Sequence, residues 1–318
     1  MPEVGCMGIL VADTFCGPLD ALPKPGELLA IDALPVSVGG CASNVAIGIA
    51  RQGHSVDAVG CLGQDAAADV VRAALTSAGV GCQHIITSAA LPTSQTIVLL
   101  VKGDDRRFIH LFGANAELSI DQVDLDWVRT LKVLYVGGLY VLPGINNSAL
   151  AELFAYCRVH GVKTVLDVVL PQQINDFSGL RAILPHVDYF LPNDDEASRI
   201  AGTTSIAEQA AHLLAWGAQT VVITQGGRGA DAARGQDRWH IAPYPMEVID
   251  TTGGGDAFAA GFIAGLLRGW DLPDMLRAGA ALGASAVRAI GTTTGVFTAD
   301  ELRAFMAAHT PEITHHTG

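Results

Sequence analysis

The segment with the clearest chemistry is the glycine-rich stretch DTTGGGDAFAAGF at residues 250–262. Three consecutive glycines precede Asp256, and helix-forming residues follow it. This order predicts a turn at the N-terminus of a helix, where free backbone N–H groups and the helix dipole favour an anion. A carboxylate in the first helical turn can also take a proton from a hydroxyl. The segment therefore predicts phosphoryl transfer to a hydroxyl, with a helix merely capped by Asp256 as the structural alternative.

Other phosphate-binding and nucleophile motifs are missing from the sequence. No GxxxxGK(S/T) stretch is present, which excludes a P-loop protein. GGGDAF lacks the third glycine of GxGxxG and comes late in the chain, so a dinucleotide-binding fold is disfavoured. The serine-hydrolase elbow GxSxG is also absent.

Apolar strand patterns alternate with helical patterns along most of the chain. Such alternation predicts a mostly parallel central sheet with helices on both faces, within a single domain over residues 1–318. The expected strands cover residues 6–12, 56–61, 133–137, 163–167, 187–191 and 220–224, and the expected helices cover residues 43–52, 66–78, 147–160, 206–216 and the stretch after Asp256.

Two segments break this alternation. Residues 14–38 and 94–113 contain Pro or Gly-Asp-Asp turns between extended stretches and show no helical pattern. We expect them to pair into a small sheet that forms a lid beside the main sheet. The alternative is that they are edge strands of the main sheet.

Composition narrows the class of protein. Half of the 318 residues are hydrophobic and 16% are charged, which is typical of a compact globular protein. The net charge of -13 argues against nucleic-acid binding, and no apolar run is long enough for a membrane helix. An acidic residue near the N-terminus argues against a signal peptide, and six scattered cysteines suggest neither a zinc site nor disulfides. We therefore expect a cytoplasmic protein.

Taken together, the motifs resemble those of the PfkB/ribokinase family of carbohydrate and nucleoside kinases. DTTGGGDAFAAGF is similar to the family's C-terminal signature DTxGAGD, with Gly254 in place of the usual alanine, and VGGCASNVAIGIARQG resembles its N-terminal signature. GILVADTF, LFGANAEL, LPNDDEASRIAG and ITQGGRGA resemble further family segments, in the family's order. The resemblance covers nearly the whole chain. It implies a ribokinase-like three-layer α/β/α fold with a β-sheet lid, ATP with Mg²⁺ and often K⁺ as cofactors, and a homodimer formed through the lid.

The resemblance also implies roles for individual residues. Asp256 is the expected general base, and Gly253, Gly254 and Gly255 are the expected anion hole. The expected acceptor-binding residues are Asp13, Gly39, Gly40, Asn44 and Asn115. The expected nucleotide-binding residues are Asn193, Thr224, Gly226 and Gly229. Glu196 is expected to act on Mg²⁺ through water, and Asp250 and Thr252 are expected to bind a monovalent cation together with carbonyls of residues 288–293.

Several of these residues have a structural alternative. Asn193 and Glu196 suit a capping arrangement at the start of a helix, and Asn44 could bond the backbone of its own helix. Arg106 and Arg107 could reach over bound phosphate from the lid, but two arginines after Gly-Asp-Asp favour a solvated hairpin.

We expect an ATP-dependent carbohydrate kinase that phosphorylates a hydroxyl of a small sugar or sugar-like molecule. A nucleoside kinase acting on a 5′-hydroxyl is the alternative, and Phe15, Phe108 and Phe112 could supply the apolar wall that a nucleobase needs. A non-catalytic sugar-binding regulatory protein is a more distant alternative, because such a protein has no need of a base such as Asp256. The sequence does not identify the acceptor or the hydroxyl.

Overall fold

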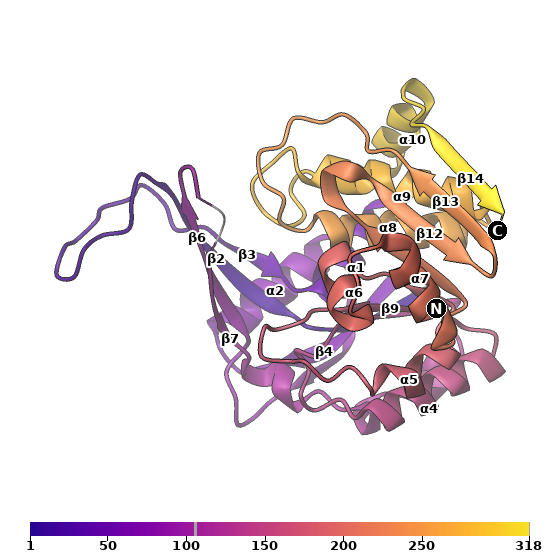
Figure 1. The fold of residues 1–318 in the computed structure, drawn as a ribbon. Coiled ribbons are helices and arrows are strands. Elements are labelled where there is room, and N and C mark those ends of the chain that lie inside the picture. The colour runs from indigo at the N-terminus through magenta and orange to yellow at the C-terminus, as the bar shows by residue number, and fades with distance from the viewer. Residues whose placement is uncertain (105–106, 318) are drawn as a thin grey trace.

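The computed structural model describes residues 1–104 and 107–317. Its main sheet contains ten strands: β1 (Val4–Gly8), β4 (Val56–Leu62), β5 (Gly81–Thr87), β8 (Val133–Leu139), β9 (Lys163–Val168), β10 (Tyr189–Phe190), β11 (Thr220–Thr224), β12 (Ala230–Arg234), β13 (Asp237–Ile241) and β14 (Ile313–Thr317). They lie in the order β14-β13-β12-β11-β10-β9-β8-β1-β4-β5 (Figure 1). The strands from β11 to β5 in this order are parallel, which confirms the predicted mostly parallel sheet.

Helices cover the sheet on both faces. The α-helices are α1 (Cys41–Arg51), α2 (Ala66–Ser77), α3 (Leu125–Val128), α4 (Asn147–Val159), α5 (Leu180–Ile183), α6 (Asp194–Ala201), α7 (Ile206–Ala215), α8 (Gly254–Leu267), α9 (Leu272–Ala286) and α10 (Ala299–Ala308). Short 3₁₀ turns are η1 (Gly113–Glu117), η2 (Ile120–Gln122), η3 (Leu184–His186) and η4 (Gly226–Arg228). Helices α1, α8 and α9 pack together, whereas α4 and α5 lie across β9 from α8 and α9 (Figure 1). None of the helices in the described ranges could cross a bilayer.

The order of the parallel strands determines where a ligand can bind. From β1 the chain continues outward to β4 and β5, and it then returns to the other side of β1 to form β8, β9, β10 and β11. The strand order therefore reverses between β1 and β8. In open parallel sheets, ligands bind in the crevice beyond the carboxyl ends of the strands at such a reversal.

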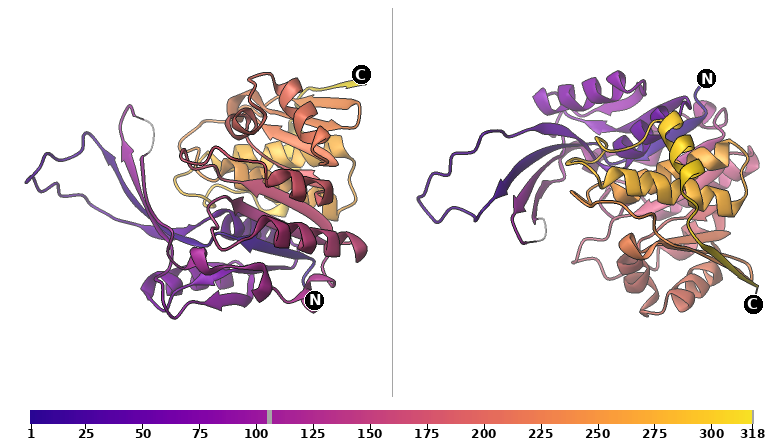
Figure 2. Two further views of the ribbon diagram at one scale, coloured as in Figure 1. Left: turned by 60° about the horizontal axis from the view of Figure 1, so that its bottom comes forward. Right: turned by 90° about the horizontal axis from the view of Figure 1, so that it is seen from above.

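A second sheet projects from the main body in all three ribbon views (Figures 1 and 2). It consists of β2 (Val11–Leu19), β3 (Val36–Gly39), β6 (Gln95–Val101) and β7 (Arg107–Leu111), in the order β3-β2-β6-β7. These strands come from the two segments that were predicted to form a lid, so the separate lid sheet is confirmed and the edge-strand alternative is wrong. Residue 106, one of the two arginines considered for phosphate binding, lies outside the described residues. Arg107 is exposed and pairs with Asp104 at 2.6 Å.

One predicted strand, over residues 6–12, is wrong, because the chain changes sheets within it. Strand β1 ends at Gly8, whose φ of 149° is in a region that favours glycine. Strand β2 begins at Val11 and pairs with β3 and β6 of the lid. Asp13 is therefore a residue of the lid sheet and does not end a strand of the main sheet.

Candidate active site

The centre of the crevice is a contact between residues far apart in sequence. Asn44 lies in the first turn of α1 and Asp256 in the first turn of α8. The Nδ2 of Asn44 donates a hydrogen bond of 2.7 Å to Oδ2 of Asp256. Burial raises the pKa of Asp256, and the hydrogen bonds from Asn44 and Cys41 oppose that rise. A carboxylate with a raised pKa is a better proton acceptor at neutral pH, which suits a general base.

The three glycines of the turn before Asp256 have different surroundings. Gly253 caps α8 with φ 78°, and a Cβ there would collide with the carbonyl of Thr292. A Cβ on Gly255 would meet no heavy atom within 4 Å, so the backbone faces open space. At Gly254 a Cβ would make only ordinary contacts. The alanine usual in the family signature would therefore fit, and the departure leaves the cradle unchanged.

Asp13 closes the crevice from the lid side. Its side chain is 8% exposed and lies against Gly39, where any Cβ would collide with the carboxylate. Gly40 takes φ 92° and caps α1, the helix that carries Asn44. Burial raises the pKa of Asp13 to about 6, the hydroxyl of Thr96 lowers it, and the charge of Asp256 raises it further. Gly39 thus leaves room for the Asp13 carboxylate, and Gly40 leaves room for the carbonyl of Ile9.

Asn115 uses its side chain inside the fold. Its Oδ1 accepts from the backbone N–H of Leu10 at 3.2 Å, and its Nδ2 donates to the Leu10 carbonyl at 3.0 Å. The amide therefore holds the link between β1 and β2, where the chain passes from the main sheet to the lid. This geometry favours a role in positioning the lid strand.

Asp167 is a carboxylate that sequence reasoning did not single out. It lies near the end of β9 and accepts a hydrogen bond of 3.1 Å from the hydroxyl of Tyr135. One of its carboxylate oxygens, the Sγ of Cys41 and one oxygen of Asp256 lie within 4.8 Å of one another. Burial and the charges of Glu196 and Asp256 raise its pKa well above the ordinary value. The sequence did contain a signal for Asp167, namely an acidic residue at the end of an apolar strand pattern. The same signal identified Asp13 as a candidate.

Asn193 and Glu196 form the capping arrangement considered above. Asn193 Oδ1 accepts from the Glu196 N–H, and Glu196 Oε2 accepts from the Asn193 N–H, both at 2.9 Å. Burial raises the pKa of Glu196 to about 7; the Asn193 hydrogen bond lowers it and the charge of Asp256 raises it. The cap therefore holds Glu196 within electrostatic reach of the half-buried Asp167 and Asp256, so a structural role and a role at the site are compatible.

A cavity of about 540 Å³ adjoins the glycine cradle. Its lining includes Asn193, Thr224, Gly254 and Gly255. Its remaining wall is largely apolar, which suits a nucleobase. Further lining residues are Gly226, Gly229, Pro243, Tyr244, Met246, Phe258 and Val287. The four predicted nucleotide-binding residues thus meet at one cavity.

Asp250 and Thr252 form a tight turn beside the cradle. Asp250 Oδ1 accepts from the Thr252 N–H at 3.0 Å and from its hydroxyl at 2.6 Å. Asp250 Oδ2 accepts from the N–H of Gly291, which ties the turn to the segment 288–293. Thr292 in that segment donates to the carbonyl of Val38 in the lid strand β3. The two segments expected to share a cation are therefore neighbours.

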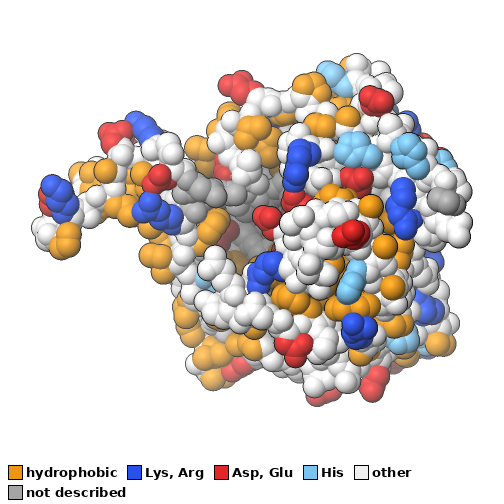
Figure 3. Space-filling view, viewed as in Figure 1, with side chains coloured by type: hydrophobic (Ala, Val, Ile, Leu, Met, Phe, Trp, Pro, Cys, Tyr) orange, Lys and Arg blue, Asp and Glu red, His pale blue; other side chains and the backbone are white. Residues whose placement is uncertain are grey.

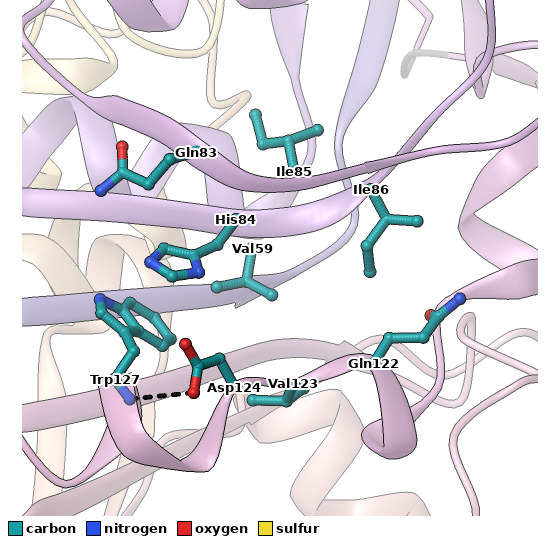
Figure 4. Close-up of a pocket in the computed structure, with 9 residues that line it drawn as sticks. All are labelled: Val59, Gln83, His84, Ile85, Ile86, Gln122, Val123, Asp124 and Trp127. Carbon is teal, nitrogen blue, oxygen red and sulfur yellow. Dashed lines mark hydrogen bonds between the residues drawn. The ribbon is translucent and has the colours of Figure 1, made fainter.

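The surface is hollowed between the projecting lid and the main body, with acidic side chains at the border (Figure 3). Another cavity, of about 160 Å³, lies between β5 and the η2–α3 segment (Figure 4). Its walls include His84, stacked on Trp127 with ring centroids 4.1 Å apart. None of the predicted site residues lines this smaller cavity.

Comparison with known proteins identifies the relatives of this chain. The family model described as "pfkB family carbohydrate kinase" matches residues 1–299. A ribokinase of Haemophilus influenzae is 28% identical, over 89% of this chain and 92% of its own length. An aminoimidazole riboside kinase of Salmonella typhimurium is 27% identical, over 85% and 88%.

Solved structures share the fold. An Arabidopsis thaliana ribokinase, in complex with ribose and ATP, is similar at a TM-score of 0.83 and 24% identity, covering 96% of this chain and 98% of its own. A putative ribokinase II of E. coli, in complex with ATP and Mg²⁺, is similar at a TM-score of 0.83 and 21% identity, covering 97% and 100%.

Proposed function

This chain belongs to the pfkB family of carbohydrate kinases, and we propose that its acceptor is a small sugar or polyol bound between Asp13 and Asn44. It is an ATP-dependent kinase of a sugar-like substrate. The observation that carries the proposal is the 2.7 Å hydrogen bond from Asn44 to Asp256, which joins the acceptor-side helix to the candidate base. Asn44 Oδ1 is buried without a hydrogen-bond partner. An acceptor hydroxyl could donate to it.

The proposed reaction is an in-line phosphoryl transfer. Asp256 takes the proton of the acceptor hydroxyl as that oxygen bonds to the γ-phosphorus of ATP. The bond from the γ-phosphorus to the bridging oxygen breaks, and ADP leaves with the electron pair. The backbone N–H groups of the Gly253–Gly255 turn stabilise the charge on the transferred phosphoryl group.

Three half-buried carboxylates support a Mg²⁺ role for this chain. Asp167, Glu196 and Asp256 all have raised pKa values, and the charge of Asp256 contributes to the rise at the other two. Carboxylates that repel one another are stabilised by a cation, and Mg²⁺ takes few direct carboxylates while keeping several waters. Asp167 and Glu196 would hold the ion. Bound Mg²⁺ supplies charge neutralisation at the phosphates.

We extend the proposal to a monovalent cation and to the assembly. Asp250, Thr252 and the carbonyls of residues 288–293 would bind K⁺, and turnover should then rise when K⁺ replaces tetramethylammonium in the buffer. Two chains would pair through the lid. Its outer face exposes Val36, Ile97 and Ile109, which lie in one row across the sheet. An exposed apolar row of this kind is typical of a protein–protein interface.

The function is tested by ADP release with Mg²⁺-ATP across free sugars, sugar acids and nucleosides. We expect one acceptor class to drive turnover, and Asp256→Asn to lower kcat by at least 10²-fold. Asp300→Asn, on the exposed face of α10, should keep full activity. Unchanged turnover in Asp256→Asn would refute the role of the base. Preference for a nucleoside would favour the alternative acceptor, and ligand binding with no ADP release would favour a non-catalytic sugar-binding protein.

A further inference from the structure

A polar row crosses the inner face of the lid sheet. The strand register places Asp13 of β2 beside Ser37 of β3 and Thr96 of β6, and places Thr96 beside His110 of β7. Residues directly opposite one another in neighbouring strands project from the same face of a sheet. The adjacent row, with Val36, Ile97 and Ile109, projects from the opposite face.

One end of this polar row, at Asp13, lies beside the candidate active site. Asp13 lies against Gly39, which directly precedes Gly40, the cap of α1. Helix α1 carries Asn44, which bonds Asp256. His110 is therefore connected to the reaction centre through two neighbouring strands of the lid, although it is 146 positions before Asp256 in the sequence.

A hydrogen bond within the row involves one of the two ring nitrogens of His110. Thr96 Oγ1 and His110 Nδ1 are 3.0 Å apart. In the tautomer whose Nδ1 carries the ring proton, Nδ1 donates to Thr96 Oγ1 and Nε2 of the neutral ring keeps its lone pair. That tautomer leaves the proton of the Thr96 hydroxyl available to the carboxylate of Asp13, its neighbour on β2. The ring keeps an exposed surface and packs edge-on against Phe112, with centroids 5.0 Å apart.

We propose that His110 is a specificity-determining residue, whose Nε2 accepts a hydrogen bond from a hydroxyl or amino group of the acceptor beyond the groups bound by Asp13. The inference rests on the kinase function proposed above and narrows its substrate class. An acceptor that presents a hydrogen-bond donor at this position is preferred. An acceptor with hydrogen, a methyl ether or a carbonyl oxygen there leaves Nε2 unpaired and binds less well.

The test compares His110→Phe with His110→Gln in the ADP-release assay. The acceptors are D-ribose, D-fructose, D-gluconate and adenosine, together with the deoxy and O-methyl analogues of the best one. Phe keeps the ring packing and removes the acceptor atom, whereas Gln restores a hydrogen-bonding group. His315→Phe, a matched change at an exposed histidine of β14 stacked on Trp239, is the control.

We expect His110→Phe to raise KM for the best acceptor at least tenfold, which is the effect of one lost hydrogen bond of about 1.4 kcal/mol. Its kcat and its KM for ATP should stay within threefold of the wild type, and His110→Gln should recover most of the loss. One of the deoxy or O-methyl analogues should bind wild type and His110→Phe equally.

Two results would overturn the inference, and they differ from each other. If His110→Phe matches the wild type with each acceptor, His110 does not contact the substrate and the kinase function stands. If the wild type releases no ADP with any of the four acceptors, the proposed acceptor class fails and this inference fails with it.

Discussion

At the scale of single residues, the site depends on carboxylates held in places where their charge is costly. Asp256 has a half-buried side chain and a raised pKa, and its hydrogen bond from Asn44 keeps the carboxylate oriented. A base with these properties is unfavourable for the fold and useful for catalysis. Asp13 allows this trade-off to be measured, because its surroundings raise its pKa to about 6.

Asp13→Asn should stabilise the protein at pH 8 and weaken acceptor binding. Folding raises the pKa of this carboxyl from 3.8 to about 6, so its contribution to stability is complete below pH 3.8 and is lost as the pH rises through 6. The variant, which cannot ionise, keeps that contribution. We expect its free energy of unfolding to exceed that of the wild type by about 3 kcal/mol at pH 8, and to match it near pH 4.

Denaturant titrations at both pH values measure the stability difference, and acceptor kinetics should show kcat/KM reduced ~100-fold at pH 8. Asp57→Asn is the matched control, because Asp57 is also buried with a raised pKa and its side chain contacts Gln83 and His84, which are not predicted site residues. Its KM for the acceptor should not change. If the wild type is more stable than Asp13→Asn at pH 8, the interactions of the ionised Asp13 carboxylate outweigh the cost of burying its charge.

At the scale of the elements, two glycines at the start of α8 are present for different reasons. Gly253 needs its left-handed φ of 78° and has the Thr292 carbonyl where a Cβ would lie. Gly255 is helical and open, and it lines the cavity beside the cradle. The first glycine is required by the fold, and the second leaves space for a ligand.

Gly253→Ala and Gly255→Ala should therefore fail in different ways. Gly253→Ala should lose about 2 kcal/mol or more of stability through backbone strain and the clash. Gly255→Ala should keep or slightly raise the melting temperature, because alanine favours helix. Its methyl group would occupy space at the cradle, so kcat/KM for ATP should fall at least tenfold. Thermal melts and kinetics of both variants check this, and full activity in Gly255→Ala would argue against phosphate binding there.

Two capping boxes in the fold allow another controlled comparison. Glu196 closes a capping box with Asn193 on α6, next to the half-buried Asp167 and Asp256, and Glu301 closes the same kind of box with Thr298 on α10. Glutamine keeps this cap and removes the charge. Glu196→Gln should leave the melting temperature nearly unchanged and raise the Mg²⁺ concentration for half-maximal turnover at least tenfold. Glu301→Gln should change neither value. Equal Mg²⁺ dependence in both variants would assign Glu196 to the cap alone.

At the scale of the whole molecule, the lid sheet uses its two faces differently. Its inner row is polar, and its outer row exposes Val36, Ile97 and Ile109, of which Ile109 is 60% exposed. A sheet with an uncovered apolar face is suited to pairing with a second copy. One small sheet would then contribute both to acceptor binding and to assembly.

Ile109→Asp should convert a dimer into a monomer. The introduced charge would be desolvated at the interface without a partner. Light scattering after size exclusion should give twice the chain mass of 33.0 kDa for the wild type and the chain mass for the variant. Val159→Asp, at a more exposed site on α4, should remain a dimer. A monomeric wild type at micromolar concentration would refute pairing through the lid.

The sequence by itself determined what depends on neighbours along the chain. The glycine turn before Asp256, the cap at Asn193, the alternation of strands and helices and the two lid segments are local patterns, because backbone conformation and helix caps depend on residues a few positions apart. Only the tertiary structure decided which residues meet. Asn44 reaches Asp256, Asp167 joins the carboxylates, and Thr96 bonds His110 because of strand order and register. Those are set by packing between distant segments, which also explains why the strand predicted over residues 6–12 changes sheets.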